Sequence, residues 1–241
     1  MLGEPLVNGH MRLVAKRASR CHGGNASKQE LSLSVTKKPP IKKIIQAAEM
    51  YQENLLDKNI LLVGLQGSEV DYLELRFLAR SFKHLTGVRT QSKSVSAMYF
   101  WRKCTGHNLS EADLALDNSG FAAMKLRASL SMFRPDLSAR EFGRPNGSRL
   151  NVDAEVFAGD QQACMGFRNY EGEYLDPMTL LSSPVGKEVK RGDRYKVVGV
   201  FSKSIRWPYY TTAIRTASTV DWHHIVHSLP NELKGLDELI P

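Results

Sequence analysis

The sequence predicts an α+β fold in which helices pack on an antiparallel sheet. In much of the first half of the chain, apolar residues recur at helical spacing. In much of the second half they alternate with polar residues, as in half-buried strands. Helices that come first and strands that follow favour segregated layers over alternating βα units. The 241 residues, 42% of them hydrophobic, suffice for one domain of about 150–200 residues plus tails.

Bulk composition narrows the classes of protein. No segment approaches the roughly 20 apolar residues of a membrane span, and no signal-peptide core lies near the start, so we expect no membrane partner. Cys21, Cys104 and Cys164 are odd in number and far apart. This pattern predicts a reducing, cytoplasmic location without a disulfide framework or a zinc ribbon. A net charge of +8 favours a polyanionic partner such as nucleic acid.

Residues 1–40 are predicted to form a basic, disordered tail. Lysine or arginine occupies positions 12, 16, 17, 20, 28, 37 and 38, against only Glu4 and Glu30, and Pro39-Pro40 closes the segment. Two interpretations stay open: a solvated tail, and a basic arm that holds nucleic acid.

The first half of the predicted domain begins with an amphipathic helix over 41–57. Two strands, 59–65 and 71–77, follow as a hairpin around Gly67. The period then changes within one stretch: from Leu78 the apolar residues recur at helical spacing until Gly87, which suits a helix C′ position. Further helices are expected over 94–104, where Ser94 is the cap, from Ser110 with a capping-box pattern, and over 120–133, where Ser119 is the cap.

From Arg149 onward the period returns to 2. We expect strands over 150–156, 163–170, 174–181, 195–201 and 209–215. Two helical segments, 221–229 and 232–239, follow and are separated by Pro230. The chain thus divides into a tail (1–40), a domain (41–215) and a C-terminal helical extension (216–241).

One group of segments resembles a phage-associated nuclease-like family of the Barnase–EndoU–colicin–RelE (BECR) superfamily. The resemblance begins with the acidic strand that runs into Phe82-Lys83-His84-Leu85-Thr86-Gly87. It continues through Met124-Lys125-Leu126, which lacks the family's preceding threonine, and through Gly166-Phe167-Arg168. The later pieces are Tyr174-Leu175-Asp176-Pro177-Met178-Thr179-Leu180-Leu181 and a strand ending in Ser202-Lys203-Ser204.

This resemblance, which covers 45–215, implies a BECR-like fold and a metal-independent endoribonuclease that needs no cofactor and leaves a 2′,3′-cyclic phosphate. His84 would be the acid or base. The implied catalytic residues are His84, Lys125, Tyr174 and Thr179, and the implied nucleic-acid-binding residues are Arg168, Lys203, Ser204 and Arg206. The implied setting is a toxin or phage-conflict protein that acts on RNA, with an antitoxin or immunity protein as a candidate partner.

Alternatives remain at each of these points. His84 can simply satisfy carbonyls at a helix end, and Lys125 can be part of a solvated helix face. The protein can be a catalytically inactive nucleic-acid-binding protein. It can also be a protein-interaction module whose apolar face waits for a partner; that face would comprise Trp222, Ile225, Val226 and Leu229. His223, His224 and His227 lie close together, but without the H-E-x-x-H glutamate we expect no metal site.

Overall fold

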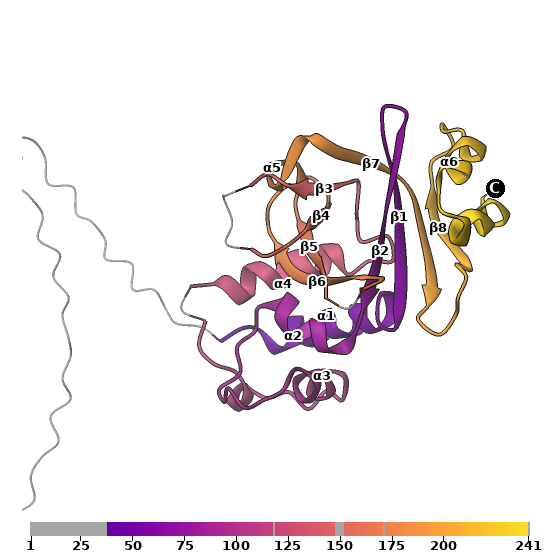
Figure 1. Ribbon diagram of the computed structural model, residues 1–241. Coiled ribbons are helices and arrows are strands. Elements are labelled where there is room, and N and C mark those ends of the chain that lie inside the picture. The colour runs from indigo at the N-terminus through magenta and orange to yellow at the C-terminus, as the bar shows by residue number, and fades with distance from the viewer. Residues whose placement is uncertain (1–37, 118, 148–151, 171, 241) are drawn as a thin grey trace, which may run out of the picture. The chain divides into compact units, whose positions relative to one another are not determined.

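The described residues, 38–117, 119–147, 152–170 and 172–240 of the computed structural model, form a strand barrel with helices along it (Figure 1). The tail expected at 1–40 falls outside these residues up to position 37. The strand expected at 150–156 falls partly outside them, and the described residues 152–155 form no strand.

Seven strands close into a barrel in the order β1-β2-β6-β5-β4-β3-β7, and β7 pairs back with β1. Among the strands of the described residues, the eighth, β8, pairs with β7 alone. The bounds are β1 Lys58–Gln66, β2 Glu69–Phe77, β3 Glu141–Pro145, β4 Val156–Gly159, β5 Cys164–Asn169, β6 Leu175–Leu181, β7 Val189–Ser204 and β8 Thr212–Thr216. The α+β class is therefore confirmed, but an open antiparallel sheet is wrong: the strands close on themselves, and β2 pairs with β6 in parallel.

The length of β7 makes this closure feasible. One of its edges is shared by two strands: β3 pairs with 189–196 and β8 with 199–202. Its other edge pairs with β1 over 196–204. Closure of this kind leaves the ring strands without a free edge at the seam. The sequence pattern predicted only part of this strand, 195–201, as a nearly continuous apolar run.

The helices α1 (Ile41–Asn54), α2 (Ala79–Thr86), α3 (Ala97–Thr105) and α4 (Phe121–Met132) lie together along one side of the barrel (Figure 1). The ring of Tyr51 meets Phe82, Trp101 and Phe133 edge-on at centroid distances of 5.6, 5.7 and 5.0 Å. Its hydroxyl donates to the Leu78 carbonyl at 2.9 Å. These contacts fix the start of α2 against α1.

Two predicted helix caps need correction. The cap of α3 is Ser96, whose Oγ accepts from the Tyr99 N–H at 3.1 Å, and not Ser94. The helix predicted from Ser110 is a single 3-10 turn, η1 (Glu111–Asp113), with the expected capping box. Besides these, a short helix α5 (Val185–Glu188) precedes β7.

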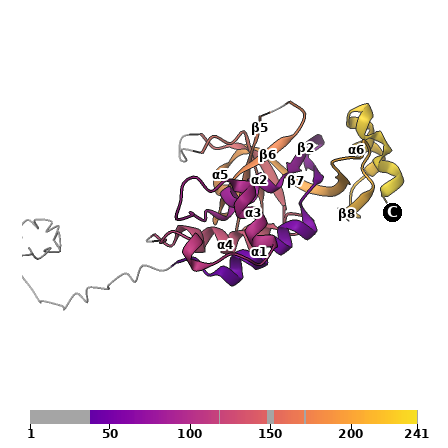
Figure 2. The same ribbon diagram turned by 90° about the horizontal axis from the view of Figure 1, so that it is seen from below.

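The C-terminal segments α6 (Trp222–Ser228) and η2 (Asn231–Leu239, a 3-10 helix) cover the outer face of β1 and β7. They lie beside β8, away from the other helices (Figures 1 and 2). Trp222 meets Phe201 edge-on at 5.8 Å, and Ile225, Val226 and Leu229 are buried. The apolar face expected to await a partner is thus covered by the chain itself. None of the described helices has the length and apolar character to cross a membrane.

Candidate active site

His84 lies in the last turn of α2, facing β6 and α4. The helix ends at Gly87, which takes the left-handed conformation (φ 65°) and donates its N–H to the His84 carbonyl at 3.1 Å. The sequence prediction of this corner is confirmed. The imidazole keeps an exposed edge and reaches the backbone of Met178 on β6.

Lys125 enters the same place from α4. Only 5% of this residue is exposed, and its Nζ donates to Thr179 Oγ1 at 3.4 Å. The ammonium also lies 5.0 Å from the centroid of the Phe121 ring. A solvated helix face, the alternative considered for this lysine, is therefore wrong. Gly87 makes the approach feasible, because a Cβ there would lie 2.7 Å from Lys125 Cδ.

A β-bulge turns Thr179 toward Lys125. In the β5–β6 pairing, Gly166 lies opposite Thr179, whereas the next residue of β5 lies opposite Pro177. Arg168 lies opposite Asp176, so Thr179 and Asp176 share the outer face of the barrel although three positions separate them. The absence of a side chain at Gly166 gives this face its space: a Cβ would come within 3.0 Å of Thr179 Cγ2.

The surroundings of His84 and Lys125 lower the pKa of both groups. Desolvation lowers the pKa of His84 below 6.5, and the nearby Lys125 ammonium lowers it further, against a hydrogen bond with the Met178 backbone that raises it. Burial lowers the pKa of Lys125 as well. Near pH 7 the site therefore holds a neutral imidazole that can accept a proton beside an ammonium that donates more readily than an exposed lysine. Such a pair can carry out general acid–base chemistry.

Tyr174 and Lys203 meet in a second cluster. The Lys203 Nζ lies 5.7 Å from the Tyr174 ring centroid and 4.6 Å from that of Tyr210, and it donates to the Pro208 carbonyl at 3.1 Å. Glu74 is 3.9 Å from the same ammonium and accepts from the Tyr210 hydroxyl at 2.6 Å. Tyr174 comes directly before β6 and lies beside Lys203, whereas Thr179 of the same strand lies beside Lys125.

Asp176 lies along β6 between these two clusters. Its carboxylate accepts from Arg76 Nε at 2.9 Å and Nη2 at 2.7 Å, and Arg80 Nη2 lies 3.6 Å away. Because Arg80 and His84 are one helical turn apart on α2, this ion pair holds the helix face that carries the histidine against β6.

The other predicted nucleic-acid-binding residues lie in two separate places. Arg168 forms ion pairs with Asp153 and Glu155, and its guanidinium lies 5.6 Å from the exposed Tyr170 ring. Ser204 ends β7, and its Oγ accepts from the backbone N–H of the exposed Arg206 at 3.4 Å. Arg168 therefore belongs to the β5–β6 face, whereas Ser204 and Arg206 belong to the end of β7.

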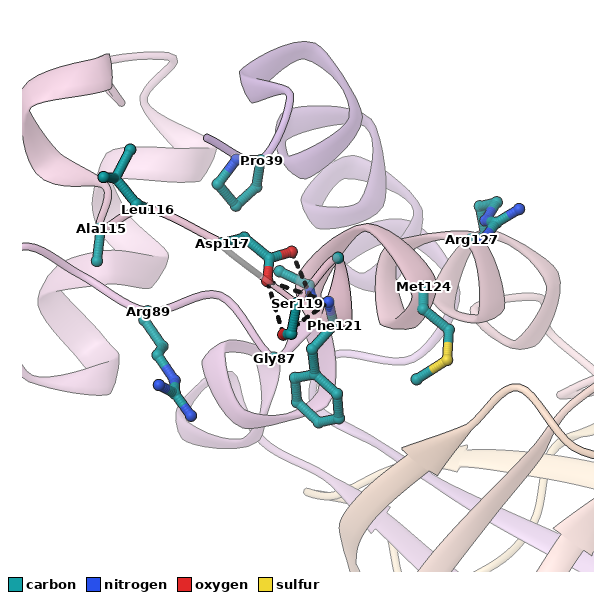
Figure 3. A pocket seen from close by; sticks show the side chains of 12 residues that line it. Pro39, Gly87, Arg89, Ala115, Leu116, Asp117, Ser119, Phe121, Met124 and Arg127 are labelled. Atoms are coloured by element: carbon teal, nitrogen blue, oxygen red, sulfur yellow. Dashed lines mark hydrogen bonds between the residues drawn. The ribbon is translucent and has the colours of Figure 1, made fainter. Parts of the chain in front are cut away.

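The sequence did not reveal a hollow of about 850 Å³ at the start of α4. Figure 3 shows the residues that line it. Gly87 and Phe121 belong to its lining and also contact Lys125, so the two sites are continuous. Asp117 caps α4 from inside the hollow, accepting from the N–H groups of Phe121 and Ala122 at 3.0 and 2.9 Å. The predicted cap, Ser119, contributes a longer contact of 3.3 Å to Phe121. The turn residues around Asp117 are the sequence feature that could have pointed to this hollow. They could not predict it, because its lining also includes residues from distant segments, such as Pro39 and Arg89.

Within the described ranges, no group of three or more His, Cys, Asp or Glu side chains is arranged to hold a metal ion. The His223 and His227 Nε2 atoms lie 3.2 Å apart on α6. Burial raises the pKa of Cys104 and of Cys164 to about 12, so both remain thiols near neutral pH.

Comparison with known proteins assigns the chain to a family. The model of the phage-Barnase-EndoU-ColicinE5/D-RelE like nuclease4 family matches residues 43–217, a span that runs from α1 through β8 and contains His84, Lys125 and Thr179. Searches of curated proteins and of solved structures gave no significant match. The resemblance found in the sequence is confirmed, and the family points to a nuclease. The chain belongs to the phage-Barnase-EndoU-ColicinE5/D-RelE like nuclease4 family.

Proposed function

We propose that the protein is a metal-independent endoribonuclease, and that His84, Lys125 and Thr179 form its catalytic centre. The observation that supports this most strongly is the burial of the Lys125 ammonium beside Thr179 and near the His84 ring. Among the described residues no carboxylate is in hydrogen-bond contact with this ammonium, and a buried cation of this kind is costly in a merely structural role. A phosphate group in the site would neutralise it.

The reaction uses the 2′-hydroxyl of the substrate as its nucleophile. Neutral His84 accepts the hydroxyl proton as the 2′-oxygen bonds to phosphorus. Lys125 and the Thr179 hydroxyl stabilise the charge that develops on the phosphoryl oxygens. The bond to the 5′-oxygen breaks, and the Lys125 ammonium supplies its proton. The products are a 2′,3′-cyclic phosphate and a free 5′-hydroxyl, and solvent returns the proton from His84 to Lys125.

The remaining predicted residues take supporting roles in this proposal. Arg168 and the exposed Tyr170 extend the substrate surface, because the exposed ion pairs of Arg168 are weak enough for a phosphate to replace them. Tyr174 and Lys203 hold the far end of β6, and Ser204 and Arg206 contact RNA that runs past the end of β7. A toxin or phage-conflict role, with a neutralising protein as partner, accords with this activity.

The proposal is tested with an RNA oligonucleotide incubated with purified protein in a chelator of divalent ions. We expect cleavage that leaves a 2′,3′-cyclic phosphate, and no cleavage where the nucleotide before the scissile bond is 2′-deoxy. The matched oligonucleotide with a 2′-deoxy nucleotide elsewhere is the control. A 5′-phosphate product, or cleavage that requires added metal, contradicts the mechanism.

A further inference from the structure

The geometry points to a base-stacking subsite in the hollow beside Lys125, in which the RNA base next to the scissile phosphate stacks on Phe121 and the following phosphate contacts Arg89. This inference rests on the proposed function, since it assigns the hollow to the same RNA chain. The hollow lies between the start of α4, the end of α2 and the segment around Leu116 (Figure 3).

Phe121 has the position that such a contact needs. It is a large aromatic residue with 42% of its surface exposed, although it lies at the start of a helix that packs on the barrel. Lys125 lies over the ring, 5.0 Å from its centroid. A phosphate held by Lys125 therefore brings the adjoining base within reach of the ring, and base–aromatic stacking tolerates any base because each has a π-face.

The walls of the hollow are built from paired backbone. The Ala115 N–H donates to the Arg89 carbonyl at 3.0 Å, and the Gln91 N–H donates to the Asp113 carbonyl at 2.9 Å. These bonds hold the two segments side by side, so that Arg89 and the exposed Leu116 both line the cavity. About 850 Å³ suffices for a nucleotide, since ligand pockets typically measure about 300–1,000 Å³.

The charges in the hollow also favour a polyanion. Arg89 is exposed, and among the described residues it forms no ion pair. Asp117 is the acidic residue of the lining, but its two carboxylate oxygens accept backbone N–H groups at the N-terminus of α4. The positive end of the helix thus compensates this carboxylate. A phosphate near Arg89 would therefore be attracted by the guanidinium, and the Asp117 carboxylate would repel it only weakly.

A protein–substrate double-mutant cycle tests the subsite. The substrates are RNA oligonucleotides with one cleavable bond, each with a single abasic position, and the protein variants are Phe121→Leu and Phe121→Trp. For the wild type we expect one abasic position next to the cleaved bond to lower kcat/KM by about 5- to 150-fold, the range for one base–aromatic stack. Phe121→Leu should show a similar loss with the intact RNA and no further loss with that abasic RNA. Phe121→Trp should retain both the activity and the abasic sensitivity.

Tyr99→Leu is the matched control, because Tyr99 is also an exposed helical aromatic with a lysine over its ring, at 5.5 Å, but lies outside the lining of the hollow. It should leave every rate unchanged. Equal abasic sensitivity in Phe121→Leu and the wild type overturns the subsite, as does unchanged activity of Phe121→Leu.

If the wild type cleaves no RNA, the proposed function fails, and the same abasic series is then measured as binding affinity by fluorescence anisotropy. A Phe121-dependent loss at one position still supports the subsite, and a uniform affinity overturns it. A nucleoside 5′-monophosphate that competes as strongly as the oligonucleotide also overturns it, because the hollow would then take a free nucleotide rather than an RNA chain.

Discussion

At the scale of single residues, the proposed chemistry depends on His84 and Lys125. Burial lowers the pKa of both groups, and the Lys125 ammonium lowers the pKa of His84 further. Both effects act in the direction that a base and an acid near neutral pH require. The site thus obtains a free base from a histidine and a ready proton donor from a lysine without a metal ion.

Replacing Lys125 with methionine tests this coupling. Methionine preserves most of the side-chain volume and removes the charge that disfavours imidazolium, so the pKa of His84 should rise. The measurement is the pH titration of the His84 ring protons by NMR. Lys187→Met, on the exposed face of α5, should leave that titration unchanged. A His84 pKa that stays constant or falls in Lys125→Met would show that the two groups are not coupled.

The pH dependence of cleavage offers a second test. His84 must be neutral to accept a proton, and its pKa lies below 6.5. Activity should therefore fall as the pH drops through a value below 6.5, and it should not fall between pH 8 and 7. At high pH, loss of the Lys125 proton should reduce activity at a pH below 10.5, the usual pKa of a lysine. Profiles of kcat/KM measured from pH 4.5 to 10.5 check both limbs, and an acidic limb centred above 6.5 contradicts the role of His84.

Residue-level sequence reasoning predicted correctly that His84 lies at the end of a short helix, because this neighbourhood is local: a strand, a short helix and a terminal glycine. It could not reveal the burial of Lys125, which depends on α4 packing against Gly87, 38 positions earlier in the chain. It also could not show that Tyr174 lies beside Lys203, or that the bulge opposite Gly166 turns Thr179 toward Lys125, because both depend on contacts between distant segments.

At the scale of elements, the end of α2 connects conformation with the site. Gly87 serves two purposes: it ends the helix in the left-handed region, and it leaves room for Lys125 and Phe121. Gly67, in the β1–β2 turn, has a similar φ of 62°, but no atom of the described residues lies within 4 Å of the position of a Cβ. A comparison of substitutions at the two glycines therefore distinguishes the effect of backbone strain from that of side-chain contact.

We expect Gly67→Ala and Gly87→Ala to lose similar amounts of stability, but we expect only Gly87→Ala to lose activity. Each should lose about 1–2 kcal/mol of unfolding free energy from the left-handed conformation. Gly87→Ala should also displace Lys125 and reduce kcat/KM by at least about tenfold, because small misplacements in a catalytic centre are costly. Thermal unfolding and cleavage rates check this. Equal activity of the two variants would show that Lys125 does not depend on the space at Gly87.

The elements that the sequence predicted well are those with clear periodicity. The β1–β2 hairpin, α2 and β6 appear within one to two residues of the expected bounds. The pattern missed β3, a five-residue strand that contains Gly143 and Pro145 and so lacks a strand signature. The helical segment predicted over 232–239 is present, and the structure shows that it is a 3-10 helix.

At the scale of the whole molecule, closure of the barrel was not predictable from local pattern. It depends on β7 reaching β1 and β3 on opposite edges, and on the parallel contact of β2 with β6. The β1–β7 and β2–β6 pairings each join segments that are about 100 or more residues apart in the sequence. The alternation of apolar residues along one strand does not indicate which strands pair with it. The closed form brings α2, α4 and β6 together at the site.

The helices α6 and η2 of the C-terminal extension lie beyond the family match, which ends at residue 217, yet they contribute to the folded core. Ile225 is 1% exposed against the outer face of the barrel. Ile225→Ala should lower the free energy of unfolding by about 2–5 kcal/mol, since it leaves a cavity under α6. His224→Ala, on the exposed side of the same helix, should change it by less than about 0.5 kcal/mol. Denaturant unfolding of both variants provides the comparison, and equal stabilities would mean that α6 is not part of the cooperative unit.

The central claim is that His84 acts on a phosphodiester in RNA, and a single comparison tests it most directly. Single-turnover cleavage of an RNA oligonucleotide with one cleavable bond is measured in chelator for the wild type and for His84→Ala. The affinity of both proteins for the uncleavable 2′-deoxy analogue is measured alongside. We predict a rate about 10²–10⁴-fold lower for His84→Ala, with nearly unchanged affinity, because several cationic contacts rather than the histidine bind the chain. Undiminished cleavage by His84→Ala would contradict the proposed catalytic centre.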